Sequence, residues 1–139
     1  MAIRFFKFRI KVSINGEVKD KYVPRIQLQS EVGFDQIAEI VEKKSTMSRG
    51  DLLGVLAEIE TAVLWMVENG HPVKLNLLGS FFPAIEAMAV DSPEEVTAKT
   101  IKRFKCIYKP SIYLKKRFKN VDFSLVDNVV KEVKYKRDK

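Results

Sequence analysis

The sequence contains only one cysteine, Cys106, and one histidine, His71. A single cysteine excludes an intrachain disulfide framework, and the lack of a Cys/His cluster excludes the common zinc sites. No apolar run approaches the roughly 20 residues that a membrane-spanning helix requires. The basic residues among the first eleven interrupt the apolar core that a signal peptide would need. We therefore expect a cytoplasmic protein that is not inserted in a membrane and binds no metal.

Patterns typical of catalysis are also missing. There is no nucleophile beside a base, no glycine-rich phosphate-binding loop and no carboxylate pair. His71 follows Gly70 at a predicted helix end and is interpreted as a surface turn residue. Cys106 lies on the more apolar side of a predicted strand and is interpreted as a small buried hydrophobic residue. We expect no enzymatic activity, no catalytic residue, no cofactor and no small-molecule substrate.

The composition is that of a folded protein, with 46% hydrophobic and 31% charged residues in a chain of 139. This content allows a hydrophobic core, and the length predicts one domain. We divide that domain into an N-terminal β-hairpin extension over 1–31, a core over 32–120, and a C-terminal strand or tail over 121–139.

The charges are segregated along the chain. Residues 1–30 carry a net charge of +5, residues 31–98 carry −8, and residues 99–139 carry +10. Such segregation favours an anionic partner that meets particular surfaces, and nucleic acid is the commonest one. Lysine-rich strands that only protect sheet edges would give the same distribution. Charge alone leaves both interpretations open.

The clearest structural signal is the stretch from Ser48 to Phe82. Ser48 is a helix cap, and Gly70 with Pro72 ends the helix. Apolar residues recur at helical spacing in one continuous stripe and in a second line beside it. These are Leu52, Val55, Leu56, Ile59, Val63, Met66 and Val67, with Leu53, Ala57 and Leu64 beside them. A helix that covers only its own domain needs one stripe, so the second predicts contact with a partner.

The elements before this stretch are a hairpin and a shorter helix. Residues 3–14 alternate as a strand, Asn15-Gly16 predicts a tight hairpin turn, and the return strand runs to about Gln29. Helical spacing then predicts a helix over 34–44. A helix-turn-helix protein reads a DNA groove with basic and polar side chains on its second helix. The second helix here has only one basic residue, Arg49, so we do not interpret the pair as a helix-turn-helix. We interpret the pair as a core and association element.

Two extended segments follow the turn at Gly79. Residues 81–90 and 96–108 predict a long hairpin, with an acidic tip at 91–95. Pro110 and Ser111 then introduce a short cationic helix. Residues 121–125 alternate as a strand that adds to a sheet, whereas 128–135 fits a helix equally well. Residues 134–139 form a charged tail.

The order of these parts resembles that of the bacterial HU/IHF histone-like DNA-binding family. The local matches are Met47–Asp51 at the start of the long helix, Val73–Leu77, the Gly79-Ser80-Phe81 turn, and Tyr108-Lys109-Pro110 followed by Leu114-Lys115. The resemblance covers about residues 32–120. The basic N-terminal hairpin is similar to that of HU-like variants from Bacteroides-type bacteria.

This resemblance implies an α+β, IHF-like fold: a helical hairpin, an antiparallel sheet with a projecting β-arm, and a short C-terminal helix. It implies an intertwined homodimer whose interface includes Leu53, Leu56, Ile59, Val63, Trp65, Met66 and Phe81. The implied function is nucleoid-associated, largely sequence-independent binding and bending of double-stranded DNA. In such proteins cations neutralise phosphates and an apolar wedge unstacks a base step. The wedge here is Pro93. The expected DNA-binding residues are Lys74, Lys99, Lys102, Arg103, Lys105, Lys109, Lys115, Lys116, Arg117 and Lys119.

The arm departs from the family pattern, because residues 84–98 contain four acidic residues before the first lysine at 99. These carboxylates disfavour insertion of the arm between phosphates. An alternative is therefore a protein-interaction or structural module that keeps the fold and has lost DNA binding. RNA binding would suit the charges, but we find no paired exposed aromatics for a stacking platform and rank it last.

Overall fold

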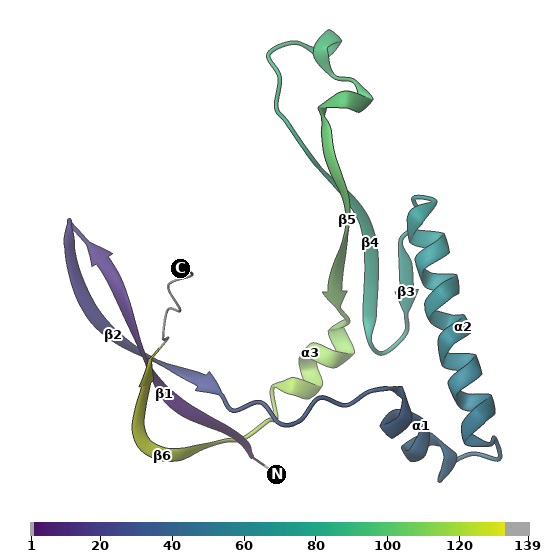
Figure 1. Cartoon of the computed structure of the whole chain (residues 1–139), viewed down its shortest axis with the longest axis horizontal. Helices are drawn as coiled ribbons and strands as arrows, with labels where there is room; N and C mark the ends of the chain where they lie inside the picture. The colour runs from purple at the N-terminus through teal and green to yellow at the C-terminus, as the bar shows by residue number, and fades with distance from the viewer. Residues whose placement is uncertain (1, 133–139) are drawn as a thin grey trace, which may run out of the picture. The chain divides into compact units, whose positions relative to one another are not determined.

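The computed structural model describes residues 2–132 (Figure 1). Their contacts form two units, one made of residues 2–30 with 119–132 and the other of residues 31–118. Each unit contains a three-stranded sheet, and the chain is α+β. These limits fall within two residues of the segment boundaries taken from the sequence. The prediction of a single domain stays a prediction.

The first unit is a mixed sheet in the order β2-β1-β6. β1 (Ile3–Ile14) and β2 (Glu17–Ile26) pair antiparallel around Asn15 and Gly16, whose φ angles are 52° and 79°. Two positive φ angles are those of the type I′ turn that the Asn-Gly pair predicts. β2 ends at Ile26, three residues before the predicted end.

The C-terminal segment completes this sheet. β6 (Phe123–Glu132) pairs in parallel with β1, so a segment distant in sequence lies beside the N-terminal strand. The predicted strand over 121–125 is thus longer than expected, and the helical alternative is wrong for 128–132. Residues 133–135 and the predicted charged tail lie outside the described residues.

The second unit begins with two packed helices, α1 (Phe34–Glu42) and α2 (Arg49–Glu68). The Ser48 side chain accepts a hydrogen bond from the Asp51 backbone N–H at 3.2 Å, which confirms the predicted cap. Gly70, at φ 86°, ends α2 as expected. α1 is two residues shorter than predicted, because Lys43 already forms its C-cap.

The sheet of the second unit is antiparallel, in the order β3-β4-β5. β3 (Val73–Leu75) is short, whereas β4 (Gly79–Ala87) and β5 (Ile101–Pro110) extend beyond it as a hairpin (Figure 1). We call this hairpin and its tip, residues 81–108, the arm. Two 3-10 helices, η1 (Pro93–Glu95) and η2 (Ala98–Thr100), form the tip, so β5 begins five residues later than predicted.

A short helix, α3 (Ile112–Phe118), follows β5. The Ser111 hydroxyl accepts a hydrogen bond from the Leu114 backbone N–H at 3.0 Å, as its predicted role as a cap requires. None of the helices in residues 2–132 is both long and apolar enough to cross a membrane.

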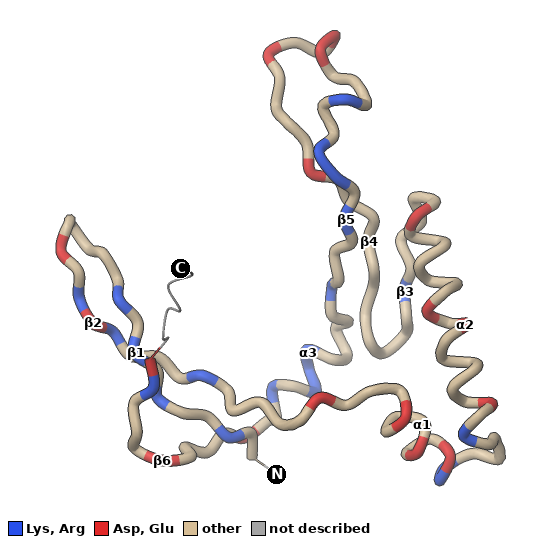
Figure 2. Tube along the Cα trace, viewed as in Figure 1, with Lys and Arg blue, Asp and Glu red and all other residues tan. Residues whose placement is uncertain are grey.

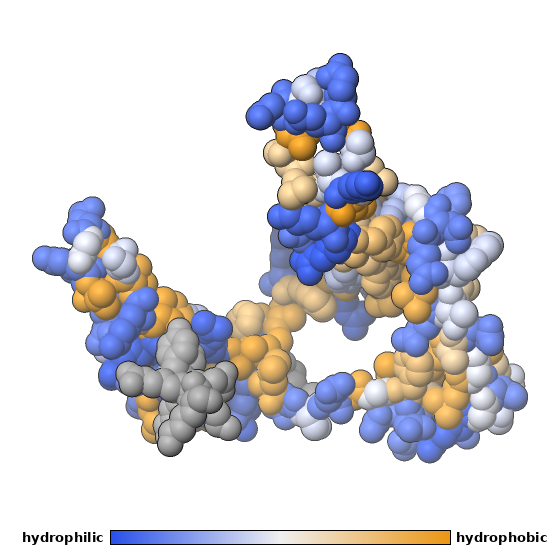
Figure 3. Space-filling model, turned by 45° about the horizontal axis from the view of Figure 1, so that its top comes forward, coloured by the Kyte–Doolittle hydropathy of each residue, from blue (hydrophilic) through white to orange (hydrophobic). Residues whose placement is uncertain are grey.

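Few side chains are fully buried. Among the described residues the buried hydrophobic side chains are Ala38, Leu52 and Val67, and hydrophobic residues reach the surface of both units (Figure 3). Every residue of β5 is exposed, because α2 packs against β3 and β4 while β5 forms the edge of the sheet. The prediction that Cys106 is buried is therefore wrong for the single chain. Many large hydrophobic side chains of the second unit, such as Ile59, Trp65 and Phe104, are thus exposed to solvent in the single chain.

Candidate nucleic-acid interface

The strand register gathers cations on one face of the second sheet. Lys74 on β3 lies opposite Ser80 on β4, and Ser80 lies opposite Lys109 on β5. Residues paired in this way point to the same side of a sheet. Further along the hairpin, Lys105 pairs with Ala84 and Arg103 pairs with Glu86, and both pairs lie on the same side of the sheet as the Ser80–Lys109 pair. We call the side chains of Lys74, Arg103, Lys105 and Lys109 the cationic sheet face.

The other side of the same sheet is apolar. Phe81 pairs with Tyr108, their ring centroids are 5.4 Å apart, and Ile85 pairs with Phe104. This side and α2 border a groove, which we call the sheet groove. Its lining is mostly apolar and includes three charged residues: Ile59, Glu60, Val63, Leu64, Val67, Glu68, Leu75, Phe81, Phe104, Lys105 and Cys106. The sheet therefore presents an apolar side towards α2 and cations on the opposite side.

The polar contacts on the cationic sheet face differ among its members. The Nε atom of Arg103 is 2.6 Å from a carboxylate oxygen of Glu86, and their side chains are 69% and 42% exposed. The Nζ atom of Lys109 lies 4.7 Å from the centre of the Phe82 ring. Within residues 2–132, Lys74, Lys105 and Lys109 form no ion pair. Their charges are thus available to an anion, whereas that of Arg103 is already partly compensated.

The other predicted DNA-binding residues lie elsewhere. Glu86 pairs with Arg103 and Ala87 pairs with Ile101, so Lys102 sits in a bulge without a partner on β4. Lys99 belongs to η2 at the tip. Lys119 follows α3, and its contacts group it with the first unit. The structure thus does not bring the ten predicted residues together on one surface.

The basic residues of α3 have a second explanation. Lys115, Lys116 and Arg117 occupy its last turn and are exposed. Cations at the C-terminal end of a helix interact favourably with the helix dipole, whether or not a ligand is present. Their positions are compatible with phosphate contacts without requiring them.

The tip of the arm is acidic, as the sequence indicates. Figure 2 shows acidic residues at the tip and basic residues along β5. Pro93 is exposed at the first position of η1 and is followed directly by Glu94 and Glu95. The Asp91 backbone N–H donates a hydrogen bond to the Glu95 carboxylate at 3.3 Å. The tip thus exposes a proline ring among carboxylates.

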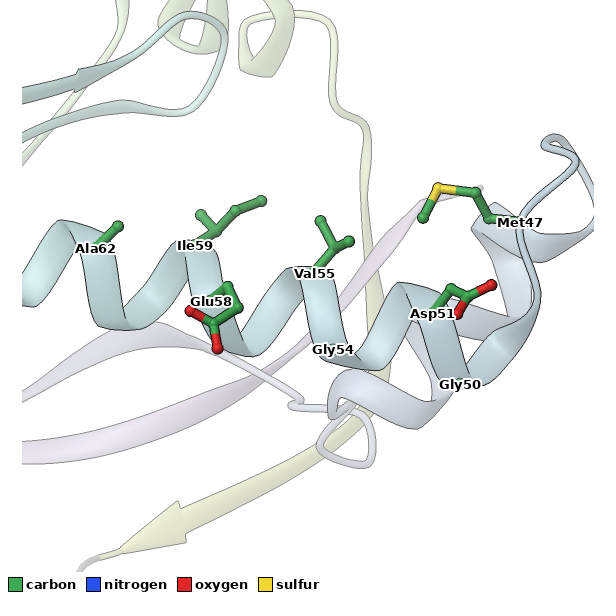
Figure 4. A pocket seen from close by; sticks show the side chains of 8 residues that line it. All are labelled: Met47, Gly50, Asp51, Gly54, Val55, Glu58, Ile59 and Ala62. Atoms are coloured by element: carbon green, nitrogen blue, oxygen red, sulfur yellow. The ribbon is translucent and has the colours of Figure 1, made fainter.

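The residues predicted for the dimer interface lie mainly on α2. Ile59, Trp65 and Met66 have exposed fractions of 47%, 60% and 42%, whereas Leu53, Leu56, Val63 and Phe81 are half-buried. A second groove runs along α2 beside Met47, Gly50, Asp51, Gly54, Val55, Glu58, Ile59 and Ala62 (Figure 4). We call it the helix groove. Ile59 lines both grooves, so the apolar surface of α2 is continuous from one to the other.

Sequence reasoning missed the contact between Arg103 and Glu86. These two residues meet only because of the register between β4 and β5. The length of the tip and the bulge at Lys102 determine that register. Neither feature can be read from the alternation of residues. Sequence reasoning also missed the row from Lys74 to Lys109, although Lys74 and Lys109 were each expected to contact DNA.

These features define an HU-like α+β protein: paired helices, an antiparallel sheet with an extended hairpin, and a short basic helix. A family model described as "HU domain fused to wHTH, Ig, or Glycine-rich motif" matches residues 1–124. The chain belongs to this family, which confirms the HU-like resemblance.

Solved structures agree on the fold. One similar crystal structure is described as a "Putative bacterial DNA binding protein from Bacteroides vulgatus ATCC 8482". Its TM-score is 0.63 at 12% sequence identity, with 91% of this chain and 50% of that chain covered. The chain thus spans about half the length of that structure, and this likeness shows the fold alone. No curated protein matches the sequence.

Proposed function

We propose that the chain binds double-stranded DNA, largely without sequence preference, through the cationic sheet face. One observation carries the proposal. Strand register places Lys74, Lys105 and Lys109 on one side of the sheet, without ion-pair partners among the described residues. Membership of the HU-domain family and the description of the similar crystal structure support DNA as the anion.

The expected mechanism is neutralisation of phosphates. Each cation that contacts a phosphate releases condensed counterions, so affinity falls steeply as salt concentration rises. Such contacts carry no sequence information, because phosphates are the same at every step. No enzymatic step is part of this function, and a DNA-coating protein of this kind acts in the cytoplasm on the nucleoid.

The proposal includes a homodimer. A single chain buries only three hydrophobic side chains among residues 2–132 and leaves the helix groove and the sheet groove open. A second copy that covers α2 would remove the exposed parts of Ile59, Trp65 and Met66 from water, which contributes about 25 cal/mol for each Å² of apolar surface buried. Two copies also double the number of available cations.

The proposal also includes bending of the bound DNA. The arm extends beyond β3 (Figure 1). Pro93 lies in η1 at its tip and is exposed. A rigid apolar ring inserted at a base step partly unstacks it and kinks the duplex. Asp91 and Glu94 oppose close approach of the tip to phosphates, so the cationic sheet face must supply most of the affinity.

The acidic tip and the pairing of Arg103 with Glu86 favour a second candidate, a protein-interaction module of HU fold that does not bind DNA. Fluorescence anisotropy with a labelled duplex of about 30 base pairs separates the two. We expect binding at 50 mM salt that weakens at least a hundredfold by 200 mM, as for several phosphate contacts. A stable dimer that leaves the duplex unbound at 50 mM salt would support the second candidate instead.

A further inference from the structure

The first unit has an aromatic pair that the sequence interpretation did not recognise. Phe6 and Phe8 lie on the same side of β1, the central strand of the sheet, and their ring centroids are 6.3 Å apart. Both side chains are half-buried, so each ring keeps part of its surface accessible. We call this side of the sheet the Phe6 face.

A cation from a different neighbouring strand lies over each phenylalanine ring. The guanidinium of Arg25 on β2 lies 4.7 Å from the centre of the Phe8 ring. The Nζ atom of Lys131 on β6 lies 4.6 Å from the centre of the Phe6 ring. Both rings are therefore in direct contact with positive charge.

Strand register extends this pattern over the whole face. Ile10 pairs with Lys21 and Val12 pairs with Lys19, so both lysines point to the side of Phe6 and Phe8. The charged residues that the register places on the Phe6 face are all exposed and carry a net charge of +4: Arg4, Glu17, Lys19, Lys21, Arg25 and Lys131.

The opposite side of the same sheet lacks this combination. Lys7, Arg9 and Lys11 lie there, but Asp20 pairs with Lys11, and Arg9 forms an ion pair with Glu132 at 2.5 Å. The net charge of that side is +1 over these five residues. The difference in charge between the two sides points to an anionic occupant for the Phe6 face.

We propose that the Phe6 face binds single-stranded nucleic acid. Bases replace Lys131 and Arg25 over the rings of Phe6 and Phe8, and the displaced cations hold the backbone together with the other cations of the face. Aromatic side chains inside a cationic surface are the means by which proteins bind single strands without sequence preference. A duplex cannot use the two rings, because its base faces are already stacked. This surface is separate from the cationic sheet face of the second unit and implies a different form of nucleic acid.

The test uses the full chain and a fluorescein-labelled oligothymidylate of about 20 nucleotides in an anisotropy titration. Phe6→Leu and Phe8→Leu keep an apolar side chain and remove the aromatic ring. Each is expected to weaken single-strand binding about tenfold, since stacking on one aromatic residue is worth about a factor of ten. Phe5→Leu is the matched control, because Phe5 is half-buried on the opposite side of the same strand. It should leave single-strand binding unchanged.

Two further variants keep the test decisive if a phenylalanine substitution unfolds the chain. Arg25→Gln and Lys131→Gln change only exposed side chains, and each should lower both the single-strand affinity and its salt dependence. Lys105→Glu, in the second unit, should weaken duplex binding and leave single-strand binding unchanged. A loss of duplex binding therefore concerns the proposed function of the cationic sheet face, whereas a loss of single-strand binding concerns the Phe6 face.

Several outcomes would overturn the inference: a wild-type chain that does not bind the oligonucleotide, an equal loss in Phe5→Leu, or unchanged binding in the Phe6, Phe8, Arg25 and Lys131 variants. Dissociation of an oligomer by Phe6→Leu, without a change in single-strand affinity, would assign the face to a second copy of the chain.

Discussion

A Cβ atom on Gly79 would lie 2.2 Å from the backbone carbonyl oxygen of Lys109. The backbone of Gly79 also has a φ of +136°, which side chains rarely tolerate. Gly79 is buried where β4 begins, so this position controls how β3, β4 and β5 meet. The next residue of β4, Ser80, pairs with Lys74 on β3 and with Lys109 on β5, so Gly79 adjoins the cationic sheet face.

Replacing this glycine should destabilise the second unit. We expect Gly79→Ala to lower the free energy of unfolding by at least 1–3 kcal/mol, the usual cost of a strained backbone, because the displacement of Lys109 adds to it. Urea denaturation followed by circular dichroism measures the effect. Ser80→Ala, at the next position, should change stability by no more than about 0.5 kcal/mol. Equal stability of the two variants would contradict the interpretation.

Charge reversal on the cationic sheet face should weaken duplex binding. Lys105→Glu removes one phosphate contact per chain, so we expect about tenfold lower affinity and a shallower salt dependence, by about 0.9 in log–log slope per chain. Lys44→Glu makes the same change in net charge at an exposed site outside the sheet. Anisotropy titrations at several salt concentrations compare the two. If both variants lose the same affinity, net charge and not the sheet face governs binding.

Removing the carboxylate partner of Arg103 should have the opposite effect. Glu86→Gln frees the guanidinium and deletes a negative charge from the cationic sheet face. The pair is largely exposed and worth up to about 1 kcal/mol, so duplex affinity should rise by up to about fivefold. Glu31→Gln makes the same substitution at an exposed site outside that face and outside both grooves. A decrease in affinity for Glu86→Gln would show that the ion pair positions Arg103 for binding.

The sequence predicted the elements better than the surfaces. The cap at Ser48, the Asn15-Gly16 turn and the stop at Gly70 depend on neighbouring residues, so local rules sufficed. The bulge at Lys102 and the pairing of β1 with β6 depend on contacts between distant segments. For this reason the ten predicted DNA-binding residues divide among separate surfaces, and the aromatic pair was missed.

In the homodimer proposed above, one charged substitution on the apolar surface of α2 should separate the two copies. Ile59 lines both grooves and is 47% exposed, so a second copy covering α2 must bury it. Ile59→Asp would place an unpaired carboxylate there, and burial of such a charge is prohibitive. We expect a monomer by analytical ultracentrifugation. Thr61→Asp, which lies in neither groove, should leave the dimer intact.

Cys106 provides an independent measurement of the same surface. It lines the sheet groove and is exposed in the single chain. If a second copy covers the groove, a thiol reagent should label Cys106 slowly in the wild-type dimer and quickly in Ile59→Asp. Labelling at the same rate in both proteins would show that the dimer leaves the sheet groove open.

The exposed proline at the arm tip predicts a specific change in DNA shape. Pro93→Ala removes the rigid ring and should reduce the bend of a bound duplex, seen as a longer end-to-end distance by fluorescence energy transfer between labelled ends. Affinity should fall little, because the phosphate contacts lie on the cationic sheet face. Ser92→Ala changes the adjacent residue, whose side chain forms no cap hydrogen bond, and should keep the bend of the wild type. An unchanged bend in Pro93→Ala would mean that the acidic tip stays outside the duplex and that any bending comes from phosphate neutralisation on one side of the DNA.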